Sequence, residues 1–577
     1  MRSHCLTAGC TPEAANATAL LQKLMHDPPG GMDRWSLEWS QHAVAVFDNV
    51  ALSVAHVLDS ICTLVQAPAD IFASSVSSVD KAYVTNFGEE VARGHPLYVV
   101  SPLLQKLRSD CRNAAGLGPW EVAATGAGSE PSYGRVVTKN LADMQGQSAV
   151  SGAGESAIVL SAELGGLEDI PEGVAAVLTA SPVDLLSHIA IRARNSNVLL
   201  VSCADPQVWE GVVAEYDGQF AALSAGPGSG DLTIEAVDAS KAGVAGVQDV
   251  ASAAMPGAGG VRLARPEGTD AWAIVPQEFR EGLVGGKSLG LKQLAMLAGE
   301  DYLVPPAFAV PYGSFERALA ASPTGVQQGF ADACSKLAAA APAGGAANLD
   351  MVAVRTALSD VRTAVSKLVL PVDMQNEIAA AVAGQGGSLE AWGAITDDSV
   401  GALDDPGSVA YQGAGAWRAL KSVWASKWTE RAFLHRRATG IPDDDLSMAV
   451  LCMGLVPADY AFVLHTQSPI AGGSKDDVYG EVVVGLGETL VGNHAGRAFA
   501  FRASKTTPGD MSLLSLPSKL EVQYAPQQNA CLIARSDSNG EDLEGFAGAG
   551  MNMHSNVTQI SVTRYPQCFP SVVLLLS

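Results

Sequence analysis

The chain has 577 residues, of which 36 are Lys or Arg and 60 are Asp or Glu, so its formal net charge is -24. This length exceeds what one hydrophobic core supports and predicts about three or four domains. The negative charge repels nucleic-acid phosphates and anionic lipid, which argues against nucleic acid as a partner. No uninterrupted apolar run reaches the roughly 18 residues of a bilayer span, so no membrane partner is expected either.

The first region, residues 1–118, is expected to be helical, because its apolar residues, such as Val50 and Val57, recur at helical spacing. It contains no cluster typical of catalysis, and a packing or spacer role is predicted. Near its start stand Glu13 and Asp27, so the segment lacks the acid-poor character of a transit peptide. The nine cysteines show no CxxC pair, and reduced thiols are therefore expected.

The second region, residues 119–239, is expected to be a compact β-rich α/β domain, because short apolar runs alternate with Gly, Pro and Asp. Four of these runs predict strands, at 157–160, 174–178, 198–201 and 232–234. Residues 240–268 follow as a Gly/Ala-rich linker, since small side chains bury too little area to offset the entropy of ordering.

The third region, residues 269–550, is expected to be α/β again. The sequence predicts a strand at 272–275, an amphipathic helix at 289–297 and inserted alanine-rich helices between 318 and 387. Residues 551–577 do not continue any of these patterns and form an unassigned tail.

The first candidate site is the segment Ser181-Pro-Val-Asp-Leu-Leu-Ser-His-Ile-Ala-Ile-Arg-Ala-Arg-Asn195. Ser181 and Pro182 suit a helix cap and first turn, which places His188 early in a helix with Arg192 on the same face. A neutral imidazole is a good nucleophile for phosphoryl transfer, and a guanidinium stabilises the charge of the moving group. A hydrogen-bonded structural histidine is the alternative.

The second candidate is the loop Gly282-Leu-Val-Gly-Gly-Lys-Ser288, before the predicted amphipathic helix. The backbone amides of such a loop, together with Lys287, suit the phosphates of a nucleotide. Glu281 stands where a Walker A loop requires glycine, so a P-loop NTPase is disfavoured. An ordinary helix-entry turn remains the alternative.

The third candidate begins at Arg535, within Ala534-Arg-Ser-Asp-Ser-Asn-Gly-Glu-Asp-Leu-Glu-Gly545. An Arg at the end of a strand, followed by hydroxyls, acids and glycines, can hold phosphates. Gly540 arrives too early for a calcium loop, which excludes an EF-hand. A solvated acidic turn is the alternative.

The fourth candidate is Glu488, in Val483-Val-Gly-Leu-Gly-Glu-Thr-Leu490, with Glu481 just before this segment. Two adjacent strands joined near a glycine turn would place the Glu488 carboxylate beside Mg-ATP. The alternative is that Glu488 serves only the fold. No hydrolase elbow, zincin motif or dinucleotide fingerprint is found.

In this order, the motifs resemble the α-glucan, water dikinase family, which is grouped with pyruvate-phosphate dikinases and phosphoenolpyruvate synthases. The resemblance covers roughly residues 33 to 550, and five segments carry it: Leu186-Ser-His-Ile-Ala-Ile-Arg-Ala-Arg-Asn195, Val284-Gly-Gly-Lys-Ser288, Val423-Trp-Ala-Ser-Lys-Trp-Thr-Glu-Arg-Ala432, Gly485-Leu-Gly-Glu-Thr-Leu-Val-Gly492 and Arg535-Ser-Asp-Ser-Asn-Gly-Glu-Asp-Leu-Glu-Gly545. It implies a multidomain α/β fold: a helical region, a swivelling phosphohistidine domain and an ATP-grasp-like nucleotide-binding domain, incomplete at its C-terminus.

The resemblance also implies a reaction and a set of site residues. The β-phosphate of ATP would pass to His188 and then to a glucosyl hydroxyl of a starch-like α-glucan, while the γ-phosphate passes to water and AMP is released. ATP and Mg²⁺ are the implied cofactors, with no metal ligand assigned. The implied site residues are His188, Arg192 and Arg194 for catalysis, and Gly285, Gly286, Lys287, Arg535 and Glu488 for the nucleotide.

Two departures from the family shape these expectations. Relatives close with segments resembling Asp-Ile-Glu-Gly and Gln-Thr-Arg-Pro, which are not found after Gly550. Loss of a metal-positioning carboxylate would slow transfer on the order of 10²-fold or more. Some relatives carry two cysteines where this chain has Leu199-Leu-Val-Ser-Cys203, so no local disulfide is expected there.

Two alternative functions therefore stay open: a catalytically incomplete fragment that acts only as a folded or binding module, and a phosphoenolpyruvate synthase-like phosphotransferase. The resemblance further implies a plastid location and allows a homodimer. The glucosyl hydroxyl that accepts phosphate is not determined by the sequence.

Overall fold

The computed structural model describes the greater part of the chain. The described residues are 12–26, 29–75, 84, 86–126, 131–144, 149, 156–165, 168, 170–171, 173–225, 232–238, 263, 265–297, 303–342, 349–384, 415–439, 441–455, 458–469, 474–485, 487–507, 509–520, 531–539 and 572–576. The predicted Gly/Ala linker lies almost entirely outside these residues. The segment from Gly540 to residue 550, and most of the tail, also lie outside them.

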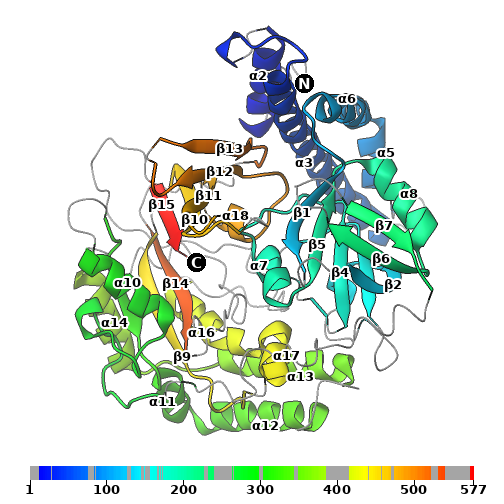
Figure 1. Ribbon diagram of the computed structural model, residues 1–577. Coiled ribbons are helices and arrows are strands. Elements are labelled where there is room, and N and C mark those ends of the chain that lie inside the picture. Colours follow the sequence, from blue (N-terminus) through cyan, green and yellow to red (C-terminus); the bar gives the residue numbers. More distant parts are fainter. Residues whose placement is uncertain are drawn as a thin grey trace.

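The N-terminal region is helical, as predicted from its apolar spacing (Figure 1). Its α-helices are α2 (Pro12–His26), α3 (Leu37–Ser75), α5 (Phe87–Gly94) and α6 (Val100–Ala114), with 3-10 turns η1 (Pro29–Gly31) and η2 (Pro96–Val99). Buried residues of α2, the first half of α3 and α6 form one apolar core.

Helix α3 differs from the sequence expectation on membranes. Within the described part of the chain it is the one helix long and apolar enough to cross a bilayer, judged by length and composition. Core helices of soluble proteins pass the same test, and the first half of α3 is a core helix here, with Val50 and Val54 fully buried.

The second region is a seven-stranded sheet in the order β1-β5-β4-β3-β2-β6-β7. The strands are β1 (Trp120–Thr125), β2 (Ser132–Thr138), β3 (Ala157–Ser161), β4 (Val174–Thr179), β5 (Leu199–Cys203), β6 (Phe220–Ala225) and β7 (Leu232–Ala236). The central strands β2, β3, β4 and β5 are parallel, and the outer pairings are antiparallel. All four predicted strands are confirmed to within a residue or two at their ends.

Two helices cover opposite faces of this sheet, with the 3-10 turn η3 (Leu141–Met144) beside it. Helix α7 (His188–Asn195) packs on one face through Ile189, and α8 (Pro206–Tyr216) packs on the other through Trp209. In a parallel β-α-β crossover the segment after the first strand lies at the carboxyl edge of the sheet, where ligands commonly bind. The chain from β4 to α7 occupies this edge.

The third region begins with η4 (Pro276–Glu278) and contains a helical layer and two sheets. Its helices are α10 (Gly286–Leu297), α11 (Ser314–Ala321), α12 (Thr324–Ala340), α13 (Met351–Ser366), α14 (Val372–Gly384), α16 (Gly415–Ala425), η5 (Ser426–Trp428), α17 (Glu430–Thr439) and α18 (Glu488–Val491). Helix α13 packs against α12 and α16 and centres the largest apolar core. The predicted inserted helices between 318 and 387 are confirmed.

This region contains two separate sheets. One has the order β14-β9-β8, made of β14 (Cys531–Ser538), β9 (Met448–Leu455) and β8 (Ala307–Val310). The other has the order β13-β12-β11-β10-β15, made of β13 (Met511–Ser515), β12 (Phe499–Ser504), β11 (Asp477–Val484), β10 (Tyr460–His465) and β15 (Val572–Leu576).

Three local expectations were wrong. Residues 272–275 do not form a strand, because only Ile274 makes a bridge, to Ala309. Ser181 and Pro182 do not start the helix, which begins at His188 itself with Ser187 as its N-cap. Arg535 lies in the middle of β14 rather than at a strand end, since pairing with β9 continues to Ser538.

The three regions contact one another around the five-stranded sheet (Figure 1). The chain before α7 packs on β10 and β11 through Leu186, which is fully buried in the core of that sheet. Arg497 of the third region pairs with Glu121 of β1, and the Asn49 side chain of α3 donates to the backbone oxygen of Ser518 at 3.2 Å.

Candidate active site

His188 is the first residue of α7 and is half-buried. Residues 180–187, which leave β4 and lead to it, form a loop rather than a helical turn. Ser187 caps the helix in an extended conformation without a side-chain capping bond, since its hydroxyl donates to the Asp184 backbone oxygen at 2.7 Å. The imidazole therefore stands at the N-terminal end of a helix, where the amides favour an anionic ligand.

The two arginines of α7 bind backbone carbonyl groups. Arg192 is largely buried and donates to the backbone oxygen of Glu168. Arg194 donates to the backbone oxygens of Ala123 at 3.1 Å and Leu185 at 2.6 Å. Burial lowers the pKa of Arg194, and the nearby Glu481 carboxylate opposes that effect. In this structure both guanidinium groups hold the surroundings of His188 in place.

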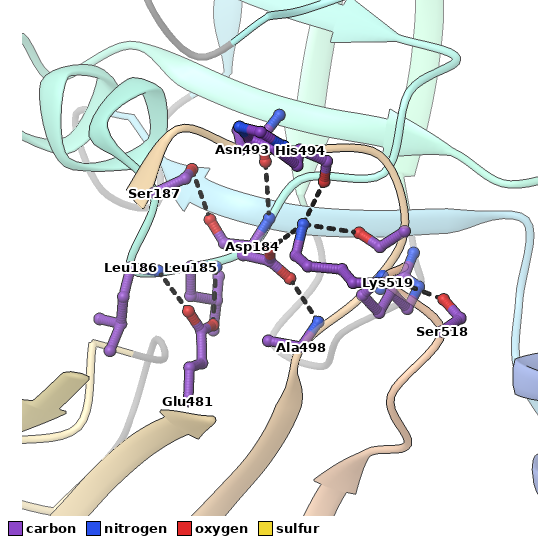
Figure 2. Close-up of polar contacts among 12 residues, drawn as sticks. Asp184, Leu185, Leu186, Ser187, Glu481, Asn493, His494, Ala498, Ser518 and Lys519 are labelled. Atoms are coloured by element: carbon purple, nitrogen blue, oxygen red, sulfur yellow. Dashed lines mark hydrogen bonds and ion pairs between the residues drawn. The ribbon is translucent and has the colours of Figure 1, made fainter. Parts of the chain in front are cut away.

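Glu481, on β11, binds the loop before His188 (Figure 2). Its two carboxylate oxygens accept hydrogen bonds from the backbone amides of Leu185 at 2.9 Å and Leu186 at 3.0 Å. The Tyr479 hydroxyl donates to the same carboxylate at 2.7 Å. Burial raises the pKa of Glu481 to about 8, the Asp184 carboxylate adds to this, and the three hydrogen bonds lower it.

Asp184 is the second point of attachment (Figure 2). Its carboxylate accepts from the Ala498 amide at 3.0 Å and pairs with Lys519 at 2.8 Å, with both side chains almost fully buried. The Asp184 amide donates to the Asn493 side chain at 3.3 Å, and Lys519 also donates to the backbone oxygens of His494 and Gly496. Breaking such a buried pair from one side is costly, because the remaining charge stays desolvated.

The Gly-Lys loop and β14 come together in space although they are far apart in sequence. The Asp537 carboxylate on β14 accepts from the Gly285 amide at 2.9 Å and from the Ser288 amide at 3.2 Å. Burial raises the pKa of Asp537, and hydrogen bonds from Ser288 and Gly285 and the charge of Lys287 lower it. Two amides at the start of α10 are therefore bound to a carboxylate of the protein itself.

Lys287 donates to the backbone oxygen of Ser536 at 3.0 Å, which places its ammonium group beside β14. Arg535 precedes Ser536 on that strand and is half-buried, opposite Leu451 of β9. The two cations predicted to contact a nucleotide are thus brought to one region. Glu488 is the first residue of α18, and its side chain lies outside what the structure describes.

The metal part of the prediction has no counterpart in the described residues. No group of three or more His, Cys, Asp or Glu side chains among them is placed to hold a metal ion. The structure therefore identifies no Mg²⁺ site, and no catalytic step is assigned to the ion here.

Sequence reasoning assigned no role to several residues of this arrangement, among them Glu481, Tyr479 and Asn493, which bind the loop before His188 or each other. Asp184 and Asp537 lie inside candidate motifs without an assigned role, and Lys519 lies outside them all. The partners of Asp184, Asp537 and Lys519 are about 250 to 335 residues away in the chain, so the sequence shows the charged residues but not what they bind.

Cys203 is buried, and its thiol donates to the Asp205 backbone oxygen at 3.3 Å. Burial raises its pKa to about 11. Five cysteines whose side chains the structure describes are free thiols: Cys62, Cys111, Cys203, Cys334 and Cys452.

Comparison with known proteins identifies two segments of this chain. Residues 120–243 match the model of the alpha-glucan water dikinase phosphohistidine-like domain, and residues 409–508 match the pyruvate phosphate dikinase AMP/ATP-binding domain. The chain is 33% identical over 518 residues to the chloroplastic alpha-glucan water dikinase of Citrus reticulata, and 32% identical over 522 residues to that of Solanum tuberosum. The predicted resemblance to the α-glucan water dikinases is confirmed.

These alignments cover 89% and 90% of the chain but only 32% of each α-glucan water dikinase, so the chain spans about a third of those relatives. A phosphoenolpyruvate synthase of Aeropyrum pernix is 30% identical over 128 residues, which is 22% of the chain. His188 lies in the segment that matches the dikinase phosphohistidine-like domain. Glu481 and Asn493, which bind the loop before His188, lie in the segment that matches the AMP/ATP-binding domain.

Proposed function

We propose that this chain is the catalytic part of an ATP-dependent α-glucan dikinase that works through a phosphohistidine. The His188 imidazole attacks the β-phosphorus of ATP, the bond from that phosphorus to the oxygen bridging it to AMP breaks, and AMP leaves. The histidine then carries both the β- and the γ-phosphoryl groups. Water attacks the γ-phosphorus, the bond from that phosphorus to the oxygen bridging it to the β-phosphorus breaks, and phosphate leaves, so that only the β-phosphoryl group stays on His188. A glucosyl hydroxyl then attacks the phosphohistidine, loses its proton and regenerates the free imidazole.

The observation that carries this proposal is the contact between the loop before His188 and the five-stranded sheet. The loop amides of Leu185 and Leu186 bind Glu481, which lies in the part of the chain similar to an AMP/ATP-binding domain. A carrier histidine must reach the nucleotide to be charged. Its loop is docked on the nucleotide-binding region through two hydrogen bonds to one carboxylate, and this supports such a role.

Each site residue has a proposed role in this scheme. Lys287 and Arg535 hold phosphate oxygens at the junction of α10 and β14, where Gly285 lets the loop lie close to β14. The Gly286 amide, at the start of α10, is a further contact for phosphate. Arg192 and Arg194 fix the α7 end on which phosphohistidine forms. Glu488, the first residue of α18, which contacts β11, helps to place Mg-ATP. Mg²⁺, when bound, would neutralise charge on the ATP phosphates.

The wider architecture is proposed on the same basis. Residues 119–239 act as a swivelling domain, residues 240–268 as its linker and residues 269–550 as an ATP-grasp-like domain. The substrate is an α-glucan, as the names of the relatives state for those proteins. A plastid location is proposed because the relatives of Citrus reticulata and Solanum tuberosum are chloroplastic.

Isotope transfer tests the proposal directly. Incubation with ATP labelled at the β-phosphate is expected to place acid-labile label on His188, and His188→Ala is expected to remove it. Because phosphohistidine formation needs the imidazole itself, the residual labelling should fall by at least about 10³-fold, the scale seen when a catalytic nucleophile is removed. Label from the γ-phosphate, or label that survives His188→Ala, contradicts the proposal.

The acceptor is tested by discharge of the labelled protein. Addition of soluble α-glucan is expected to transfer the label to carbohydrate, whereas addition of pyruvate is expected to leave it on the protein. Pyruvate-dependent discharge would favour the phosphoenolpyruvate synthase-like alternative, whose relatives match a shorter part of the chain.

A further inference from the structure

The contact between Glu481 and the His188 loop joins two regions through backbone atoms. Leu185 and Leu186 lie two and three positions before His188, and both amides point into the Glu481 carboxylate (Figure 2). Tyr479, two residues earlier on the same strand, donates to Glu481 and so orients the carboxylate. A carboxylate that binds two consecutive amides fixes the direction of the chain, which a single hydrogen bond does not.

The surroundings make this contact strong and selective. Glu481 is buried, and Leu186 fills the apolar core of the five-stranded sheet beside it. If the loop separated, Leu186 would be exposed and the carboxylate would lose two of its three described donors. The docked position of α7 is therefore favoured by apolar burial and by hydrogen bonds at the same place.

We propose that Glu481 is a positioning residue that holds the His188 loop in the orientation in which His188 receives phosphate from the nucleotide. This inference rests on the proposed phosphohistidine function. Glu481 does not touch the reacting atoms; it acts through the Leu185 and Leu186 amides on the start of α7. Glu481 lies in the part of the chain similar to an AMP/ATP-binding domain, so it assists the step in which His188 receives phosphate from ATP. The later step, in which phosphate passes from His188 to the acceptor, does not use Glu481.

The molecule provides a matched control at Glu377 on α14. One oxygen of Glu377 accepts from the consecutive amides of Trp272 at 2.7 Å and Ala273 at 2.9 Å. This is the same kind of contact between a carboxylate and two neighbouring amides, but it lies within the third region and does not involve the His188 loop. Substitution of Glu377 therefore reports the general cost of losing such a contact.

The test uses the full chain with Glu481→Ala, Glu481→Gln and Glu377→Ala. Three quantities are measured: labelling of His188 by β-labelled ATP, discharge of prelabelled protein to soluble α-glucan, and hydrogen exchange of a peptide covering 183–191. Glu481→Ala is expected to slow labelling at saturating ATP by about 10-fold or more, the scale of a small misplacement of a reacting group. The KM for ATP and the discharge rate should stay within about twofold of wild type.

Glu481→Gln tests a partial loss of the contact, and Glu377→Ala is the control. Glu481→Gln keeps one acceptor oxygen, so its labelling rate should fall between wild type and Glu481→Ala, and this variant also covers the case in which the alanine variant does not fold. Glu377→Ala should label normally. The Leu185 and Leu186 amides should exchange faster in the Glu481 variants than in Glu377→Ala.

Two labelling results overturn the inference: normal labelling in Glu481→Ala, or labelling and discharge reduced to the same extent. Its failure differs from a failure of the proposed function. Wild-type protein that takes no label on His188 rejects the function itself, and hydrogen exchange of residues 183–191 then decides separately whether Glu481 holds the loop. Unchanged exchange in both Glu481 variants rejects the positioning role in every case.

Discussion

At the scale of single residues, Gly285 shows why glycine is needed beside β14. A Cβ atom at this position would lie 2.6 Å from the Ser538 backbone oxygen and 2.7 Å from the Asp537 carboxylate. Backbone atoms cannot move aside as a flexible side chain can, so any larger residue would push the Gly-Lys loop away from the strand. The sequence predicts that Gly285 lies close to phosphate, whereas in the structure it lies close to β14 of the protein itself.

Gly285→Ala is therefore expected to lower the free energy of unfolding by about 1–3 kcal/mol, the usual cost of overpacking. Gly290→Ala is the control, because Gly290 lies within α10, the helix that follows Gly285, and has no atom within 4 Å of its would-be Cβ. That change should raise stability by about 0.5–1 kcal/mol, since alanine favours a helix. Urea denaturation of both variants measures the difference, and equal effects would contradict the packing argument.

The candidate residues themselves were only partly predictable. Gly285, Lys287 and Arg535 were selected from local patterns, and the structure brings their segments together. Local patterns did not show that the Asp537 carboxylate accepts hydrogen bonds from the Gly285 and Ser288 amides, because Gly285 and Asp537 are 252 residues apart in the chain. The role of each site residue stays a prediction until ligand binding is measured.

At the scale of elements, the loop from β4 to α7 is shaped by its partner rather than by its own sequence. Ser181 and Pro182 are good helix-starting residues, yet the helix begins seven residues after Ser181, at His188. Residues 184–186 instead give their hydrogen bonds to Asn493 and Glu481. Tertiary contacts that satisfy backbone amides outside a helix override a modest local preference.

Leu186→Ala is expected to weaken the attachment of this loop to the five-stranded sheet. Leu186 is fully buried in that core, so truncation should lower the free energy of unfolding by about 2–5 kcal/mol. Leu200→Ala is a matched change, since Leu200 is equally buried but lies in the core of the seven-stranded sheet.

Hydrogen exchange separates these two changes. Leu186→Ala should speed exchange in β10 and β11, whereas Leu200→Ala should speed it only in the seven-stranded sheet and its helices. An unchanged exchange rate of β11 in Leu186→Ala would show that Leu186 does not hold the two regions together.

At the scale of the whole molecule, docking of the second region on the third buries two carboxylates, Asp184 and Glu481, near each other. Arg194, Arg497 and Lys519 are cations near them, and the Tyr479 hydroxyl is a neutral donor. A folded-state pKa of about 8 lies above the ordinary value of 4.5. The raised pKa of Glu481 therefore contributes stability that is complete below its ordinary pKa and is lost as the pH rises through about 8.

Between pH 5 and 8, the free energy of unfolding of wild type is therefore expected to fall relative to that of Glu481→Gln. The expected change in this difference is about 1 kcal/mol or more, the equivalent of one pKa unit. The difference is the proper quantity, because burial lowers the pKa values of His42, His465 and His494, which changes stability in the opposite sense over this range. Thermal unfolding at several pH values measures it, and a pH-independent difference would show that Glu481 does not titrate there.

The sequence alone predicted many of the helices and strands and the resemblance to a known family. Hydrophobic spacing and turn residues predicted the helical first region and the four strands around His188, because these patterns act over a few residues. Ordered motifs identified the resemblance to α-glucan water dikinases, which the comparisons bear out. Tertiary structure decided where α7 begins, how far β14 extends and which acids bind the Gly-Lys and His188 loops. The extent of β14 depends on its pairing with β9, and the other features depend on burial and on contacts between residues some 250 to 335 positions apart, which no local pattern contains.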